Sequence, residues 1–242
     1  KGRALNQMFE KNANAEAIKM LDAAINADQS NPLPYSWKAC TIGQSIALGF
    51  REDNDKNKAE LIEALSKANE MNDNDWNALR IIAEAHLTLN DYQQSMVYAN
   101  KAYNANPNHP YVLWIYGRIL VRFDKVESGI KVLEKLYEIE PMALADVNTD
   151  RIIKELFVAY YLINSFEKCN ELFSKIQEPG FREWLMLIDI KIKNKADYLS
   201  ESWFNLGLSK FKDLDFNKEI KLFHLNNKEV DLRLLQTADN TF

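Results

Sequence analysis

Glycine, proline and cysteine are scarce in this chain of 242 residues, which contains seven glycines, six prolines and two cysteines. So few turn-forming residues argue against an all-β fold, because many short strands need many tight turns. Cys40 and Cys169 lie far apart in the sequence and form no Cys-X-X-Cys motif. We therefore expect two small buried thiols rather than a disulfide or a metal site.

Excess positive charge and long apolar runs are also missing. The chain has 30 Lys and Arg residues against 35 Asp and Glu residues, which gives a net charge of −5. Nucleic-acid-binding domains usually carry a basic patch, so the sequence predicts no nucleic-acid partner. The chain has no apolar run of the roughly 18 residues that a membrane span needs, so we expect no direct membrane insertion.

The sequence contains no recognisable catalytic or cofactor motif. His86, His109 and His224 do not have zinc-ligand spacing. No phosphate-binding glycine loop, dinucleotide fingerprint or nucleophile elbow occurs either. We predict that the chain is not an enzyme and that it binds no cofactor and no metal. We expect His86 to be a packed structural residue and His109 to be solvated in a turn.

Two compartments stay open from the sequence. Free cysteines and the lack of a signal-like apolar start favour the cytoplasm. The chain starts at Lys1 inside an expected helix, so we expect it to be a piece of a longer protein. If an upstream membrane helix has been cut away, the chain is instead the periplasmic part of a membrane-anchored protein.

A repeat of 34 residues is the strongest positive signal in the sequence. Pro107 and Pro141 are 34 residues apart, and the stretches in front of them run in parallel. The matched residues are Leu79 with Leu113, Ala83 with Gly117, Asp91 with Asp124 (one place off), Ser95 with Gly129, and Ala102 with Leu136. Such a period is typical of stacked helix–turn–helix units, so the sequence predicts an all-α, right-handed superhelix, or α-solenoid.

The repeat is clearest at 76–109 and 110–143, where apolar residues recur at helical spacing. Small residues fall where the two helices of a pair must touch, and these are Ala83 with Ser95 and Gly117 with Gly129. Degenerate repeats are expected at 1–31, 32–75, 144–180 and 181–211. Residues 212–242 predict a cap with two short helices over the exposed end of the stack. We expect these parts to form one domain, 1–242.

The spacing of Leu79, Ala83 or Gly117, Tyr92, Ala102, and Pro107 or Pro141 resembles the tetratricopeptide repeat, although Ser95 and Gly129 replace its usual alanine. This resemblance implies a non-catalytic scaffold that binds proteins or peptides. A narrower resemblance comes from the long first helix that ends at Gly49-Phe50, the charged loop after it and the late Leu-Arg-Leu-Leu-Gln-Thr-Ala segment. In these features the chain resembles the repeat region of bacterial adenylate or guanylate cyclases and of winged-helix transcription activators. It implies a regulatory part of a bacterial signalling protein.

The tetratricopeptide resemblance also implies which side chains line the concave groove. On the first helices of the two clear repeats, the candidate partner-binding residues are Arg80, Tyr111, Trp114, Arg118 and Arg122. Arginine and tryptophan are common in binding hot spots, and a guanidinium group suits carboxylates of a peptide. The alternative is that these arginines are solvated or pair with Glu84, and that Trp114 packs between repeats.

Three hypotheses for function stay open at this point. The chain is a module that binds a protein, a peptide or another domain of the same polypeptide. It is a small-molecule sensor, with a ligand held in the groove by Tyr111, Trp114, Tyr116 and Tyr160. Finally, it forms a homodimer through a phenylalanine-rich C-terminal end, unless these side chains fold into a cap; they are Phe204, Phe211, Phe216 and Phe223.

Overall fold

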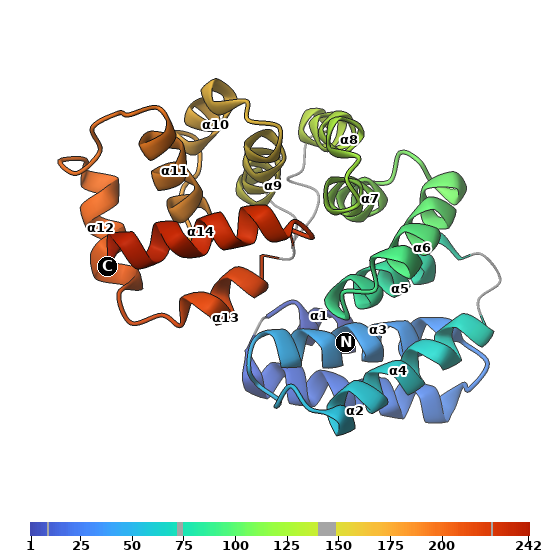
Figure 1. The fold of residues 1–242 in the computed structure, drawn as a ribbon. Coiled ribbons are helices and arrows are strands. Elements are labelled where there is room, and N and C mark those ends of the chain that lie inside the picture. The colour runs from blue at the N-terminus through green and yellow to red at the C-terminus, as the bar shows by residue number, and fades with distance from the viewer. Residues whose placement is uncertain (9, 72–74, 140–148, 224) are drawn as a thin grey trace. The chain divides into compact units, whose positions relative to one another are not determined.

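The computed structural model describes residues 1–8, 10–71, 75–139, 149–223 and 225–242, and within these ranges its regular structure is entirely helical. The helices are α1 (Gly2–Asn6), α2 (Lys11–Ala27), α3 (Pro32–Ala47), α4 (Asp55–Glu70), α5 (Trp76–Thr88), α6 (Tyr92–Ala105), α7 (Pro110–Arg122), α8 (Val126–Glu138), α9 (Thr149–Leu162), α10 (Phe166–Phe173), α11 (Phe181–Lys193), α12 (Ser202–Phe211), α13 (Phe216–Lys221) and α14 (Lys228–Thr241) (Figure 1). The predicted all-α class is confirmed.

The chain divides into two compact units, Lys1–Ile119 and Leu120–Phe242, which we call unit 1 and unit 2. The single domain 1–242 stays a prediction. The predicted helix pair in the repeat at 76–109 is confirmed as α5 and α6. Pro141, which was expected to end the second clear repeat, and His224 lie outside the described residues.

Left-handed backbone residues mark the turn between the two helices of a pair. They are Gly49, Asn90, Asp124, Asn164 and Lys195, with φ of 69°, 58°, 59°, 57° and 52°. After α5, the amide of Asn90 donates to the carbonyl of Leu87 and that of Asp91 to the carbonyl of His86, both at 3.0 Å. These are the two hydrogen bonds of a Schellman cap, in which a left-handed residue satisfies the last carbonyls of a helix.

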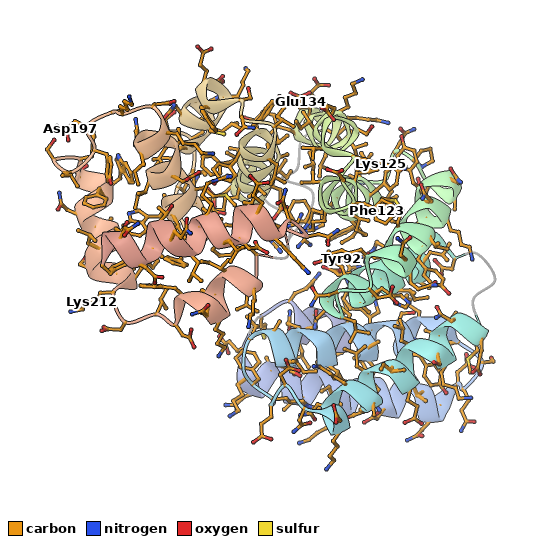
Figure 2. All side chains as sticks on the ribbon, in the orientation of Figure 1. Tyr92, Phe123, Lys125, Glu134, Asp197 and Lys212 are labelled. Carbon is orange, nitrogen blue, oxygen red and sulfur yellow. The ribbon has the colours of Figure 1, made fainter. Side chains whose placement is uncertain are left out.

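The same cap closes α3, α7, α9 and α11. The amide that follows each left-handed residue donates to the carbonyl five residues earlier, in the pairs Phe50 to Ser45, Lys125 to Leu120, Ser165 to Tyr160, and Ala196 to Lys191. Asn90, not Asp91, is therefore the equivalent of Asp124, and this corrects the one-place offset in the sequence match. Figure 2 labels Phe123 and Lys125 beside the second of the clear turns, where the Lys125 ammonium lies 5.9 Å from the centre of the Phe123 ring.

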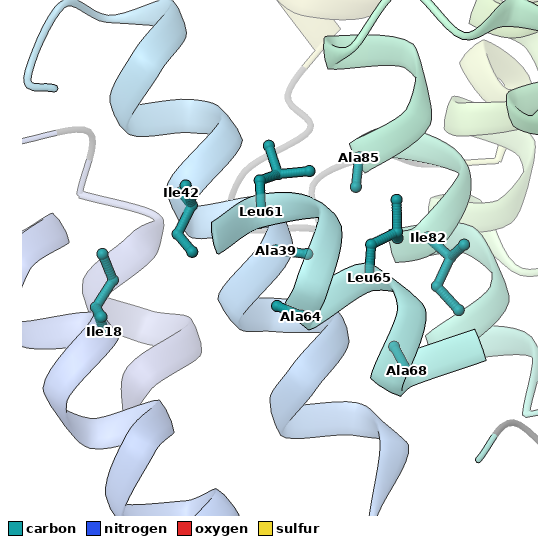
Figure 3. Close-up of a cluster of buried hydrophobic side chains, with 9 residues drawn as sticks. All are labelled: Ile18, Ala39, Ile42, Leu61, Ala64, Leu65, Ala68, Ile82 and Ala85. Atoms are coloured by element: carbon teal, nitrogen blue, oxygen red, sulfur yellow. The ribbon is translucent and has the colours of Figure 1, made fainter. Parts of the chain in front are cut away.

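Small and aliphatic residues fill the core of unit 1. One cluster draws Ile18 from α2, Ala39 and Ile42 from α3, Leu61, Ala64, Leu65 and Ala68 from α4, and Ile82 and Ala85 from α5 (Figure 3). Alanines at these contacts let helix backbones approach closely, so the pairs can stack. The predicted contact of Ala83 with Ser95 is confirmed, because Ser95 Oγ donates to the Ala83 carbonyl at 2.8 Å. The contact of Gly117 with Gly129 stays a prediction.

Aromatic residues fill the end of unit 2. The Phe181 ring lies 5.6 Å from the rings of Phe211 and Phe216, and the Trp184 ring lies 5.9 Å from that of Phe204. Phe204, Phe211 and Phe223 are buried. Three of the four phenylalanines that could have formed a dimer surface are thus buried in unit 2, and Phe216 is half-buried against Phe181, as the folded-cap alternative expects.

The C-terminal segment differs from the two short helices that we expected. Its second helix, α14, has 14 residues and packs against α11 and α13, so it does more than close the end of the stack. Its buried residues, Val230, Leu234, Thr237 and Ala238, lie on one face at helical spacing. A largely polar composition hides this face, which explains the shorter helix predicted from the sequence.

Candidate docking face of unit 1

The first helices of the pairs in unit 1 are α1, α3 and α5, and the side that they form, together with α7 up to Ile119, is here called the helix-A face of unit 1. Asparagines hold the short helix α1 in place on it. Asn6 Nδ2 donates to Thr41 Oγ1 at 3.1 Å and to Gln44 Oε1 at 3.2 Å. Asn14 Nδ2, from α2, donates to the Thr41 carbonyl at 3.0 Å. Because Asn6 and Asn14 are buried, the bonds of Asn6 fix α1 on α3, and that of Asn14 fixes α2 on the same turn of α3.

Arg80 lies at the centre of the face, between two aromatic rings. Its guanidinium carbon is 5.4 Å from the centre of the Trp37 ring and 4.7 Å from that of the Tyr111 ring. Arg80 Nε donates to Asn77 Oδ1 at 2.9 Å, which orients the group. The side chain is 3% exposed, so its positive charge would act on a bound partner mainly through the electrostatic field and not through direct contact.

Arg3 reaches the same two rings from α1, but its side chain is exposed. Its guanidinium carbon is 5.5 Å from the centre of the Trp37 ring and 5.2 Å from that of Tyr111. Arg3 Nη2 also donates to the Tyr111 hydroxyl at 3.0 Å. Cation–π contacts and this hydrogen bond therefore hold an accessible guanidinium group at a defined place.

A histidine lies beside the two arginines of the cluster. The His109 ring lies tilted against Trp76 and stacks with Tyr111, with ring centres 4.1 Å and 5.8 Å apart. Burial first, and then the charges of Arg80 and Arg3, lower the pKa of His109. We expected His109 to be solvated, but it is half-buried between these rings. A neutral imidazole beside two arginines leaves the cluster ready for a negative group.

Arg118, Trp114 and Glu84 form the neighbouring part of the face. Arg118 Nη1 lies 3.7 Å from Glu84 Oε1, and its guanidinium carbon lies 5.0 Å from the centre of the Trp114 ring. Trp114 is buried. The alternative in which an arginine pairs with Glu84 therefore describes Arg118, and the indole of Trp114 supports the pair.

Arg122 is placed differently from the other candidate residues, because it belongs to unit 2 and is 2% exposed. Its Nη1 and Nη2 donate to Oε2 and Oε1 of Glu155 at 2.8 Å and 3.4 Å. Arg182 Nη1 also donates to Glu155 Oε1 at 3.0 Å. The expectation that Arg122 is offered to a partner is thus not supported, since its side chain is committed to a buried ion pair.

Sequence reasoning missed Arg3 and Trp37, although Arg3 contacts the predicted residue Tyr111 and Trp37 contacts the predicted residue Arg80. The inner positions were assigned only in the two clear repeats, because the charged loop after Gly49 breaks the register upstream. An arginine in the first turn of the chain and a tryptophan in the next first helix were the available signals.

The described residues contain no group of three or more His, Cys, Asp or Glu side chains that could hold a metal ion. Cys40 and Cys169 are free thiols in the structure, and burial raises the pKa of Cys169 to about 12. His86 is a packed residue as predicted, since its ring stacks on Tyr98 with centres 5.4 Å apart. Among the helices that the structure describes, none combines the length and the apolar character needed to span a bilayer.

Comparison with known proteins gives the fold but no family by sequence. Neither a protein-family model nor a curated protein matches the chain. Among solved structures, the chain is similar to PilF of Pseudomonas aeruginosa, with a TM-score of 0.61, 13% identity, and coverage of 88% of this chain and 93% of PilF. A tetratricopeptide repeat protein of Parabacteroides merdae matches with a TM-score of 0.57 and 14% identity, covering 98% of both chains.

A third similar structure is YrrB, described as a tetratricopeptide protein with an unusual peptide-binding site. Its TM-score is 0.53 at 12% identity, with coverage of 80% of this chain and 93% of YrrB. At such low identity these matches establish the fold alone. The chain has a tetratricopeptide-like helical-repeat fold, as its sequence pattern predicted.

Proposed function

We propose that this chain is a non-catalytic protein-interaction module, and that its docking face is the helix-A face of unit 1. The observation that carries the proposal is the exposed Arg3 held over Trp37 and Tyr111, above the buried charge of Arg80. Aromatic and arginine side chains in one patch are the usual composition of a binding hot spot. The fold, which several peptide- or protein-binding repeats share, is compatible with this role.

The face suits an extended peptide segment that carries a carboxylate beside an apolar side chain. The carboxylate would accept hydrogen bonds from Arg3, whose planar guanidinium group suits two oxygens at once. The field of Arg80 and the neutral His109 would favour the same negative group. An apolar neighbour would cover the half-buried Trp76. Acidic side chains of a partner thus find a positive surface that the overall charge of −5 does not reveal.

A peptide library displayed against the whole chain tests the proposal. We expect the selected peptides to be enriched in Asp and Glu and to bind the Arg3→Glu variant at least about tenfold more weakly, which corresponds to 1.4 kcal/mol. The matched control is Lys56→Glu, an equal charge change on the exposed surface of α4. Peptides that bind wild type and Arg3→Glu equally well would show that the docking face lies elsewhere.

The narrower part of the proposal is that the chain belongs to a bacterial signalling protein, next to a cyclase or winged-helix domain. The support is the sequence resemblance around Gly49-Phe50 and in the late Leu-Arg-Leu-Leu-Gln-Thr-Ala segment. The partner is then a domain of the same polypeptide, and the compartment is the cytoplasm or, for a membrane-anchored protein, the periplasm. The complete reading frame around the chain tests this context, because an unrelated neighbouring domain would rule it out.

The second candidate function is a small-molecule sensor. Its support is the aromatic content of the first helices, but the hydroxyls of all three predicted tyrosines already have partners, that of Tyr111 being Arg3. The Tyr116 hydroxyl donates to Asn100 Oδ1 at 3.0 Å, and the Tyr160 hydroxyl donates to Glu134 Oε1 at 2.6 Å. Burial and then Glu134 raise the pKa of Tyr160 to about 12. A thermal-shift screen of metabolites separates the two candidates, since a ligand that binds only the folded chain raises its melting temperature.

A further inference from the structure

Helix α14 packs against α11 (Figure 1) and reaches α9, the first helix of the preceding pair, through a side-chain hydrogen bond. Arg233, in the middle of α14, is its main polar contact. Arg233 Nε donates to Asp189 Oδ2 of α11 at 3.1 Å, and Nη2 donates to the Tyr161 hydroxyl of α9 at 2.9 Å. The Tyr161 hydroxyl itself donates to Asp189 Oδ2 at 2.6 Å. One arginine thus forms hydrogen bonds with a carboxylate on one first helix and a phenol on the neighbouring one.

The two ends of the C-terminal segment are also anchored within unit 2. Before α14, Asn226 Nδ2 donates to the Arg122 carbonyl at 2.9 Å. At the far end, the Phe242 ring lies 5.6 Å from the Trp184 ring and 4.9 Å from the Phe216 ring. Between them, α14 buries one apolar face. The segment is therefore bound as an amphipathic helix would be in a groove.

The groove keeps its charge balance without α14. Lys193 Nζ lies 3.3 Å from Asp189 Oδ2, and the same ammonium lies 5.8 Å from the centre of the Tyr161 ring. Burial and the Asp189 carboxylate raise the pKa of Tyr161, so its hydroxyl keeps the proton that it donates to Asp189. If α14 leaves, Asp189 retains two partners, so no uncompensated buried charge is created.

The fit of α14 to the groove is imperfect at one residue. The Oδ1 atom of Asp231 is buried, and no hydrogen-bond partner for it is found among the described residues. A buried carboxylate oxygen without a partner opposes the bound position. Leu232, the next residue, is 62% exposed and adds little to the contact. A helix with the same arginine but without this carboxylate would fit better than α14 does.

We propose that the helix-A face of unit 2, formed by α9 and α11, is a docking groove for an amphipathic helix that presents an arginine to Asp189 and Tyr161, and that α14 is its exchangeable resident. A partner helix of this chemistry binds by displacing α14. The groove is distinct from the docking face of unit 1, where an exposed arginine belongs to the face and the partner supplies the acid. In unit 2 the face supplies the acid and the occupant supplies the arginine.

The test uses the whole chain and a fluorescent peptide of residues 227–242. Leu232→Gly weakens the helix propensity of α14 without touching the groove, so the labelled peptide should bind this variant about fivefold more tightly than wild type. The matched control is Leu206→Gly, the same change at an equally exposed leucine of α12. We expect it to leave the affinity for the peptide unchanged.

Two altered peptides test the chemistry of the occupant. A peptide with Arg233→Ala should bind at least about tenfold more weakly, and one with Asp231→Ala should bind more tightly than the native sequence. Hydrogen exchange gives an independent readout, in which α14 should open before α9 and α11 do. Equal peptide affinity for Leu232→Gly and wild type, or exchange of α14 only together with α9 and α11, would overturn the proposal, because α14 would then be a fixed part of unit 2.

Discussion

The two units connect the helices of a pair by the same type of turn, but they differ in the side chains of their cores and in the groups on their helix-A faces. Unit 1 packs alanines and aliphatic residues between its pairs, whereas unit 2 ends in a cluster of phenylalanines around Phe181 and Trp184. The polar groups differ as well. In unit 1 an exposed arginine lies over aromatic rings, whereas in unit 2 Arg122 is buried in an ion pair with Glu155, and Arg233 of α14 pairs with the buried Asp189. One repeat architecture therefore supports an open face in one unit and an occupied one in the other.

The largest difference that we expect between the units concerns their ion pairs. Replacing Glu155 with Gln should cost about 3 kcal/mol, since it leaves the buried guanidinium of Arg122 without its carboxylate. The equivalent change in unit 1, Glu84→Gln, removes a partly exposed pair with Arg118 and should cost at most about 1 kcal/mol. Urea denaturation followed by circular dichroism measures both. Equal losses would mean that burial does not separate the two units.

A smaller contrast is expected at two helical glycines. A Cβ atom on Gly207 would collide with the indole of Trp184 in unit 2, so overpacking, less the gain in helix propensity, should make Gly207→Ala cost about 1.5 kcal/mol. In unit 1, a Cβ on Gly43 would come no closer than 3.2 Å to Thr88 and 3.3 Å to Leu61. Alanine is a better helix former by about 1 kcal/mol, which should make Gly43→Ala nearly neutral. Melting temperatures of the two variants check this order, and a destabilised Gly43→Ala would contradict it.

Acid should weaken unit 1 through His86. Burial lowers the pKa of His86 below its ordinary 6.5, although its Nδ1 lies 3.2 Å from an Asp91 carboxylate oxygen. The unfolded chain therefore binds the proton more readily than the folded one. Stability is full above the unfolded pKa of 6.5 and is lost as the pH falls below it towards the folded pKa. His109 shifts in the same direction.

The urea midpoint at several pH values between about 7.5 and 5.5 measures this loss. The variant His86→Gln, which cannot take up a proton, should show a shallower decline, with the remainder coming from His109. If His86→Gln and wild type lose stability in parallel, His86 does not cause the acid sensitivity.

The smallest effects are expected at the left-handed turns. Lys195 adopts a φ of 52° at the turn after α11, a conformation that suits glycine better. Lys195→Gly should stabilise unit 2 by about 0.5–1 kcal/mol. In unit 1, Gly49 has a φ of 69° and nothing within 4 Å of an added Cβ, so Gly49→Ala should cost about 1 kcal/mol through backbone strain alone. Hydrogen exchange of the flanking helices reports both changes, and effects of the opposite sign would show that the turns are not under this constraint.

The fold could be predicted from the sequence where small residues and turn residues repeat in register. Ala83 and Ser95 occupy a helix contact that leaves no room for larger side chains. The spacing of such small residues therefore predicts which helices pack together. Asn164 and Lys195 occupy the same position in their turns as Asn90 does in its own, but the number of residues from one such turn to the next varies. For this reason the later pairs looked degenerate, although their caps are the same.

The candidate site could be predicted only in part, because side-chain partners come from other helices. Tyr111 and Arg80 were found from their inner positions, yet the arginine that completes their cluster lies over 70 residues earlier, at Arg3. Arg122 occupies a similar inner position, but Glu155 follows it 33 residues later and neutralises it. Position within a repeat thus indicates which way a residue faces, whereas its accessibility depends on neighbours that the repeat does not specify.

The Schellman caps make the helix pairs from α3 onwards self-terminating. The first helix satisfies its last carbonyls from its own turn, so folding back into the second helix needs no group from a neighbouring pair. The segments between pairs do not have to satisfy these carbonyls, and they vary in length. Whole pairs can therefore be exchanged as cassettes with cuts at 106–109 or 177–180, and a chimera so built would inherit its turn geometry while acquiring new surface chemistry.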